Sequence, residues 1–210
     1  MQEMKTYPNN FFDLAIVDPP YGIDIANMNL GIGKSKKASK IENRKWKKKQ
    51  WDKEKPTHEY FNELFRVSRN QIIWGGNHFD IKPCYGYVIW DKEIPDGLSF
   101  ADCELAWHSF RVAPKIFKHS VYLGKGGKFH PTQKPIALYI WLLNNYAKQG
   151  DLILDTHVGS ASSLIACEKM DFDYVGYEID IDYYNAAQQR LKEFRMQTDL
   201  FRDQEQAEKR

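Results

Sequence analysis

Short apolar runs, three of which end in acidic residues, alternate with segments of helical periodicity along this chain. The apolar runs predict strands at residues 11–18, 71–74, 85–90, 151–155 and 174–179. The helical periodicity predicts helices at residues 57–67, 135–148, 160–170 and 183–196. Such alternation indicates an α/β domain with a mostly parallel sheet, in which ligands bind at the carboxyl ends of strands.

A single domain over residues 1–196 accommodates these elements, because a chain of this length can bury one full core. Residues 24–56 have little periodicity and much charge, so they are expected to form a basic insertion loop. We expect residues 104–110 and 111–117 to pair as a hairpin, and residues 197–210 to be a polar, frayed tail.

Membrane and metal partners are not expected from the composition. No apolar run approaches the roughly 18 residues that a membrane-spanning helix needs, and residues 1–10 lack the apolar core of a signal peptide. The three cysteines are far apart and lack metal-ligand spacing. We expect them to be reduced and mostly buried, which favours the cytoplasm.

Positive charge is concentrated in one segment. Residues 34–55 contain eleven Lys or Arg residues and three acidic ones, whereas the rest of the chain has nineteen basic and twenty-five acidic residues. Lysines can neutralise phosphates, and Trp46 and Trp51 could stack on bases. The composition alone fits a solvated loop as well.

A rigid shelf follows the first predicted strand, which ends at Asp18. Pro19 and Pro20 fix the backbone, and their carbonyls can accept hydrogen bonds from a ligand. A carboxylate and a carbonyl could together accept both N–H groups of an exocyclic amine, and Tyr21 could stack on its ring. The pattern is equally typical of a turn with a packed tyrosine.

Two motifs in this order resemble those of the amino-methyltransferases, which modify adenine N6 or cytosine N4. They are Asp18-Pro19-Pro20-Tyr21 and His130-Pro131-Thr132-Gln133-Lys134-Pro135, followed by a Gly/Ser strand-to-helix turn. The order resembles the circularly permuted β class, in which the catalytic motif precedes the cofactor motif. The resemblance covers residues 11–180 and implies a three-layer, Rossmann-like methyltransferase fold that uses S-adenosylmethionine.

The resemblance also implies site residues. Asp18 and the Pro19 carbonyl would bind the amine, Pro20 would stiffen the shelf and Tyr21 would stack on an extruded base, with direct transfer and no metal. The implied cofactor contacts are His130, Thr132, Gln133, Lys134, Asp155, His157, Gly159, Ser160 and Glu178. His130 fits a capping role equally well, and Asp180 or a solvated strand-end acid are alternatives for Glu178.

Three residues depart from the family pattern Asp-Pro-Phe-x-Gly-Ser-Gly around Asp155. This chain has Thr156, His157 and Ala161 at the second, third and last positions. The alanine is expected to be a small change because the helix would already have begun there. The family also has a strand before the helix that leads to the first motif. We expect either that the start of this sequence is internal or truncated or that the sheet is one N-terminal strand short, and that this protein binds the cofactor weakly or is unstable.

The expected partner is double-stranded DNA, with adenine N6 as the methylated atom. The residues expected to contact DNA are Lys45, Trp46, Lys47, Lys48, Lys49 and Trp51. Gly75, Gly76 and Asn77 could line the base pocket. Cytosine N4 remains an alternative, although a serine often replaces Asp18 there. RNA, protein glutamine and a non-catalytic nucleic-acid-binding subunit are weaker alternatives, the last favoured by the altered glycine motif.

Overall fold

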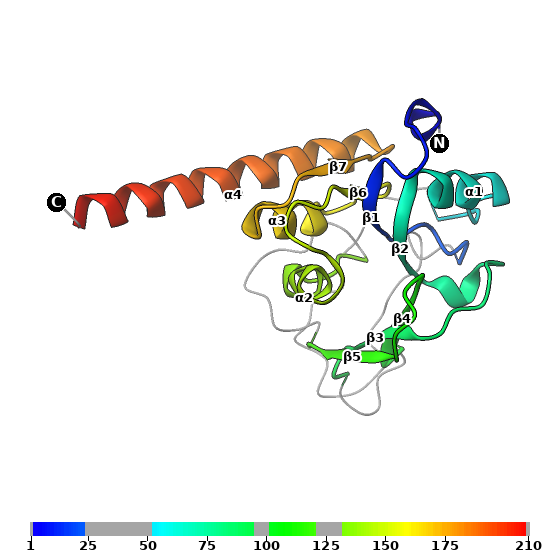
Figure 1. The fold of residues 1–210 in the computed structure, drawn as a ribbon. Coiled ribbons are helices and arrows are strands. Elements are labelled where there is room, and N and C mark those ends of the chain that lie inside the picture. Colours follow the sequence, from blue (N-terminus) through cyan, green and yellow to red (C-terminus); the bar gives the residue numbers. More distant parts are fainter. Residues whose placement is uncertain (1, 24–51, 95–100, 121–131, 209–210) are drawn as a thin grey trace.

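The computed structural model describes residues 2–23, 52–94, 101–120 and 132–208 (Figure 1). The strands are β1 (Phe12–Val17), β2 (Ser68–Trp74), β3 (Tyr87–Asp91), β4 (Cys103–His108), β5 (Lys115–Lys118), β6 (Ile153–Asp155) and β7 (Tyr174–Gly176). The helices are α1 (His58–Val67), α2 (Ile136–Tyr146), α3 (Ser162–Lys169) and α4 (Ile181–Glu208), with 3₁₀ turns η1 (Glu3–Thr6) and η3 (Gly76–His78). The predicted strands and helices are therefore present, with most ends shifted by a few residues, although α4 continues twelve residues past the predicted end at residue 196.

One mixed sheet of seven strands forms the centre, in the order β5–β3–β4–β2–β1–β6–β7. Strands β2, β1, β6 and β7 run parallel, whereas β4 is antiparallel to β2 and β3. Asp18, Gly75, Asp155 and Glu178 lie at or just beyond the carboxyl ends of the four parallel strands. Residues far apart in sequence are thereby brought to one edge, where α/β sheets bind ligands.

Helices cover both faces of the sheet, which gives three layers (Figure 1). Leu14 and Ile16 of β1 face α2 and α3, whereas Ala15 and Val17 face α1. This alternation follows from the two-residue period of a strand. Each large apolar side chain buried in these layers contributes about 1.5–3 kcal/mol to the stability of the fold. The edge of the sheet that holds these acids therefore belongs to a well-packed core.

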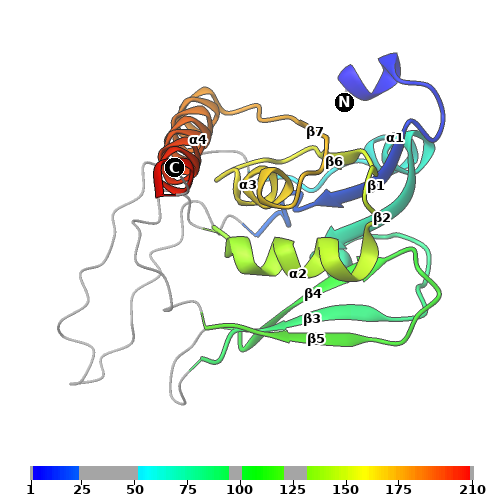
Figure 2. The ribbon, with the colours of Figure 1, turned by 60° about the vertical axis from the view of Figure 1, so that its left-hand side comes forward.

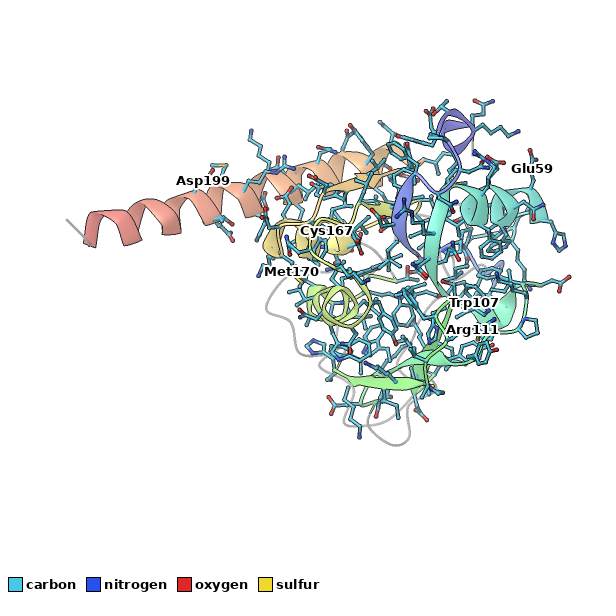
Figure 3. All side chains as sticks on the ribbon, viewed as in Figure 1. Glu59, Trp107, Arg111, Cys167, Met170 and Asp199 are labelled. Atoms are coloured by element: carbon cyan, nitrogen blue, oxygen red, sulfur yellow. The ribbon has the colours of Figure 1, made fainter. Side chains whose placement is uncertain are left out.

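Helix α4 packs its first half on α3 through Ala187 and Leu191, both of which are buried. Its second half projects beyond the body (Figures 1 and 2). The labelled side chains show the contrast, since Trp107 and Cys167 lie within the body and Asp199 lies on the projecting part (Figure 3). The segment expected to fray from residue 197 is thus helical through Glu208.

Two other predictions need correction. The hairpin of residues 104–110 with 111–117 is wrong, because β5 pairs with β3 and both edges of β4 are occupied by β2 and β3. The cysteines are free, as expected, but only Cys167 is buried, whereas Cys103 is exposed and Cys84 is half-buried.

Strand β7 ends the sheet on one side, and its only partner among the described strands is β6. Within the described ranges no helix is long and apolar enough to cross a membrane.

Candidate active site

Asp18 stands one residue beyond β1, and both of its carboxylate oxygens have partners. The Tyr21 hydroxyl donates to Oδ1 at 2.7 Å, and Lys134 Nζ donates to Oδ2 at 2.5 Å. Burial raises the pKa of the Asp18 carboxyl, and the Lys134 ammonium opposes that shift. A neutral hydrogen-bond donor can replace the hydroxyl at Oδ1 far more readily than it can replace the buried ammonium at Oδ2.

The ring of Tyr21 lies flat against two residues that follow β2. It stacks on the His78 ring with centroids 4.9 Å apart and an interplanar angle of 15°. It also lies against Gly75, where an added Cβ would stand 2.2 Å from Tyr21 Cε1 and where φ is +65°. Glycine is therefore required at position 75 for both the backbone conformation and the ring. The expectation that this glycine lines a base pocket stays a prediction.

Asp52 fixes the backbone of the same turn and was not singled out from the sequence. Its Oδ1 accepts hydrogen bonds from the backbone N–H groups of Tyr21 at 2.8 Å and Gly22 at 3.1 Å. The Asp52 residue is only 1% exposed. Nearby, Lys55 Nζ donates a hydrogen bond to the His78 carbonyl. Residues 52–55 therefore contact the backbone of both members of the stacked Tyr21–His78 pair. An acid among many lysines gave no reason to expect burial.

Lys134 lies at Asp18, immediately before α2, rather than in a separate cofactor region. Its side chain is 2% exposed, and its Nζ contacts Glu104 Oε2 at 3.1 Å as well as Asp18. Burial would lower the pKa of the Lys134 amine, but the two carboxylates outweigh burial and raise it. Lys134 therefore remains a buried cation. Glu104 was likewise missed, because only the pairing of β4 with β3 and β2 brings it here.

The turn between β6 and α3 is held by short-range hydrogen bonds to Asp155. Its Oδ1 accepts from the His157 backbone N–H at 2.9 Å, and its Oδ2 accepts from Ser163 Oγ at 2.5 Å. Burial raises the pKa of Asp155 to about 7, against the effect of these two donors. The carboxylate thus shapes the turn from inside.

The departures at Thr156 and His157 form one connected chain with Tyr60 of α1. The Tyr60 hydroxyl lies 2.6 Å from Thr156 Oγ1, which lies 2.9 Å from His157 Nδ1. Burial lowers the pKa of His157 to about 4, so its ring is neutral at neutral pH. The hydroxyl chain gives one ring nitrogen a partner, which a phenylalanine at this position would not need.

Glu178 and Asp180 have separate tasks beyond β7. Glu178 Oε2 accepts from the Gly159 backbone N–H, and Oε1 accepts from the Asp180 backbone N–H, both at 2.8 Å. Asp180 Oδ1 instead accepts from the backbone N–H groups of residues 182 and 183, at the start of α4. Glu178 thus contacts the glycine turn directly.

Arg190 of α4 holds the other side of this turn. Its guanidinium donates to the Ser160 carbonyl at 2.5 Å and to Ser162 Oγ at 3.0 Å. Ala161 lies between them with φ +59° and ψ 21°, in the left-handed region. The expectation that the helix has already begun at Ala161 is wrong, because α3 begins at Ser162. An L-residue carries strain in this conformation.

The structure thus brings Asp18, Tyr21 and Lys134 together, and separately Asp155, His157, Gly159, Ser160 and Glu178. Gln133 lies beside the first group, and its Oε1 is buried without a hydrogen-bond partner in the described part of the chain. A buried orphan acceptor is costly unless a ligand or water pairs with it. Thr132 is half-buried. His130 and the predicted DNA contacts from Lys45 to Trp51 lie outside the described residues.

Two further features lie apart from the predicted site residues. A groove of about 1440 Å³ lies between α2, the end of α3 and α4, and none of the predicted site residues lines it. No group of three or more His, Cys, Asp or Glu side chains within the described ranges could hold a metal ion.

Comparisons with known proteins find one matching family and several relatives. The family N6_N4_Mtase, described as "DNA methylase", matches residues 73–189, which is more than half of the chain. "Type II methyltransferase M.HpaI" from Haemophilus parainfluenzae is 37% identical over 75 residues, covering 36% of this chain and 24% of that protein. "Type II methyltransferase M2.MboI" from Moraxella bovis is 27% identical over 143 residues, covering 68% of this chain and 48% of that protein. The match therefore spans half or less of the length of these two relatives.

Among solved structures, the crystal structure of the M1.HpyAVI–SAM complex matches with a TM-score of 0.55 and 20% identity. The match covers 90% of this chain and 92% of that one. At this identity the likeness establishes the fold.

Proposed function

This chain belongs to the DNA methylase family N6_N4_Mtase, and from that premise we propose that it methylates an exocyclic amine of a DNA base. The methyl donor is S-adenosylmethionine, and the base is adenine, modified at N6. The observation that carries the proposal is the pairing of the two carboxylate oxygens of Asp18. One of its oxygens is paired with a buried ammonium, and among the described residues the other accepts a hydrogen bond from a neutral hydroxyl.

The β6–α3 turn and Gln133 fit the cofactor. Glycine at position 159, with φ +50°, allows close approach of the backbone, and Glu178 supports that approach from β7. Gln133 Oε1, which has no hydrogen-bond partner among the described residues, offers a buried acceptor next to Lys134. When bound, S-adenosylmethionine supplies an electrophilic methyl group. Residues Asp155 to Ser160, with Gln133 and Glu178, would hold it.

Asp18 acts on the base in this proposal. Its Oδ1 accepts one N–H of the exocyclic amine in place of the Tyr21 hydroxyl, and the Pro19 carbonyl accepts the other. These two acceptors orient the nitrogen lone pair and stabilise the positive charge that develops on it. Once released from Asp18, the Tyr21 ring offers its face to an extruded base.

The family name covers both N6 and N4 enzymes. Adenine is favoured over cytosine because position 18 is an aspartate, whereas cytosine-N4 enzymes often have a serine there. A non-catalytic subunit is less consistent with an intact, buried Asp18–Lys134 pair. Contact of residues 45–51 with double-stranded DNA stays a prediction, and so does the circular permutation. Free cysteines are typical of proteins in the reducing cytoplasm, which would also contain the DNA substrate.

The test is mass spectrometry of nucleosides from unmethylated double-stranded DNA incubated with protein and S-adenosylmethionine. Wild type should yield N6-methyladenine, and Asp18→Ala should not. N4-methylcytosine alone would reverse the choice of base. No methylated nucleoside from a correctly folded wild type would overturn the proposal.

A further inference from the structure

Glu104 is a half-buried acid for which the proposed mechanism gives no role. It lies in β4 opposite Trp90 of β3, and its side chain is 26% exposed. Each carboxylate oxygen contacts a different lysine: Oε1 is 2.7 Å from Lys92 Nζ, and Oε2 is 3.1 Å from Lys134 Nζ. Glu104 is therefore the link between a lysine next to β3 and the lysine that holds Asp18.

Four formal charges are joined in this way, and they sum to zero. Lys92, Glu104, Lys134 and Asp18 contribute two positive and two negative charges in one connected series. Removing the charge of Glu104 would leave one net positive charge beside Asp18.

The surroundings of the series screen charge poorly. Lys134 Nζ lies 5.1 Å from the centroid of the Trp74 ring, and Lys92 Nζ lies 5.6 Å from that of Trp90. Aromatic rings in place of water strengthen electrostatic effects over a few ångströms. Burial would raise the pKa of Glu104, but Lys134 and Lys92 outweigh it and lower the pKa to about 2. Glu104 therefore carries its charge at any working pH.

We propose that Glu104 is a positioning residue for methyl transfer, which holds Lys134 on Asp18 Oδ2 and offsets its charge. The assignment rests on the proposed function. As the bond from the amine nitrogen to the methyl carbon forms, the bond from that carbon to the sulfonium sulfur of the donor would break, with its electron pair, to leave a neutral thioether. The positive charge thereby passes to the amine nitrogen, until the nitrogen gives a proton to solvent water. With Glu104 in place, Asp18 keeps a negative potential at Oδ1, where that charge appears. Without it, Lys134 and Lys92 together oppose that charge.

The test compares wild type, Glu104→Gln and the double variant Lys92→Met/Glu104→Gln. Glutamine keeps the shape of Glu104 and removes its charge, so kcat should fall by about ten- to a hundredfold, with the KM for DNA little changed. The double variant returns the series to zero net charge, so it should recover most of that loss. Calorimetric cofactor affinity and the thermal melt are measured for all three.

A purely structural role for Glu104 would not produce this recovery. The assignment is overturned if Glu104→Gln turns over like wild type, or if the double variant is as slow as the single one. If Glu104→Gln fails to melt cooperatively, the double variant decides: kcat within about tenfold of wild type supports the assignment, and a hundredfold loss overturns it. Inactivity of the wild type would instead overturn the proposed function, and the assignment with it.

Discussion

Asp18 and Asp155 end neighbouring strands at the same edge of the sheet, yet they are held in opposite ways. Asp18 is paired with a side chain 116 residues away, and that side chain is charged. Asp155 is held by one backbone N–H and one hydroxyl, both within eight residues of it. The first region is built around charge and the second around backbone shape. We expect substitutions near Asp18 to change turnover and substitutions near Asp155 to change cofactor affinity.

Replacing the acid of the first region should have the largest effect. Asp18→Ala removes the acceptor for the amine and the countercharge, so turnover should fall by about a thousandfold or more. Asp18→Asn keeps an acceptor oxygen without the charge and should lose less. Initial rates with saturating DNA and cofactor measure both. An Asp18→Ala rate within tenfold of wild type would mean that the first region does not carry the chemistry.

Loosening the second region should act on binding. Glu178→Gln leaves one carbonyl oxygen for two backbone donors, so the glycine turn loses a hydrogen bond of about 1.5 kcal/mol. The cofactor Kd should rise by about tenfold, with turnover at saturation within a few-fold of wild type. Glu193→Gln on the exposed face of α4 is the matched control. A fall in saturated turnover with unchanged Kd would erase the distinction between the two regions.

A pH effect should belong to the second region. His157 has its pKa lowered to about 4 in the folded protein, whereas an unfolded histidine titrates near about 6.5. Between these values the unfolded chain binds a proton that the folded chain does not. Stability is therefore present above pH 6.5 and is lost as the pH falls toward 4, by about 3 kcal/mol at most.

Substitution isolates this effect of His157. His157→Phe should lose less stability than wild type between pH 7 and pH 5, as measured by urea unfolding at both values. The raised pKa of Asp155 acts in the opposite direction and is present in both proteins, so it cancels in the comparison. Equal losses in the two proteins would show that the His157 ring is not held neutral by burial.

The smallest effect should come from Ala161. Ala161→Gly relieves a left-handed conformation that costs an L-residue about 1–2 kcal/mol. It also removes a buried methyl group worth about 0.8 kcal/mol and adds freedom to the unfolded chain. The free energy of unfolding should change by less than about 1 kcal/mol. The opposite kind of change, Gly159→Ala, places a Cβ at a residue with φ +50° and should destabilise more, because the strain exceeds the gain from a less flexible unfolded chain. Paired melts would reveal the difference.

The sequence singled out residues of both regions and missed tertiary partners in both. The hydrogen bonds of Asp155 are local, but Tyr60 and Arg190 reach the β6–α3 turn from α1 and α4, and the left-handed Ala161 was not expected. Asp52 and Glu104 reach the first region through tertiary contacts that no local pattern encodes. The hairpin prediction failed for the same reason. Both edges of β4 are already paired with β2 and β3, so β5 pairs with the remaining edge of β3.

Calorimetric titration of S-adenosylmethionine into wild type, Asp18→Ala and Glu178→Gln tests the division between the two regions most directly. We expect the same Kd for wild type and Asp18→Ala within about threefold, and a Kd about tenfold higher for Glu178→Gln. Loss of binding in Asp18→Ala, with wild-type binding in Glu178→Gln and cooperative melts for both, would contradict this division.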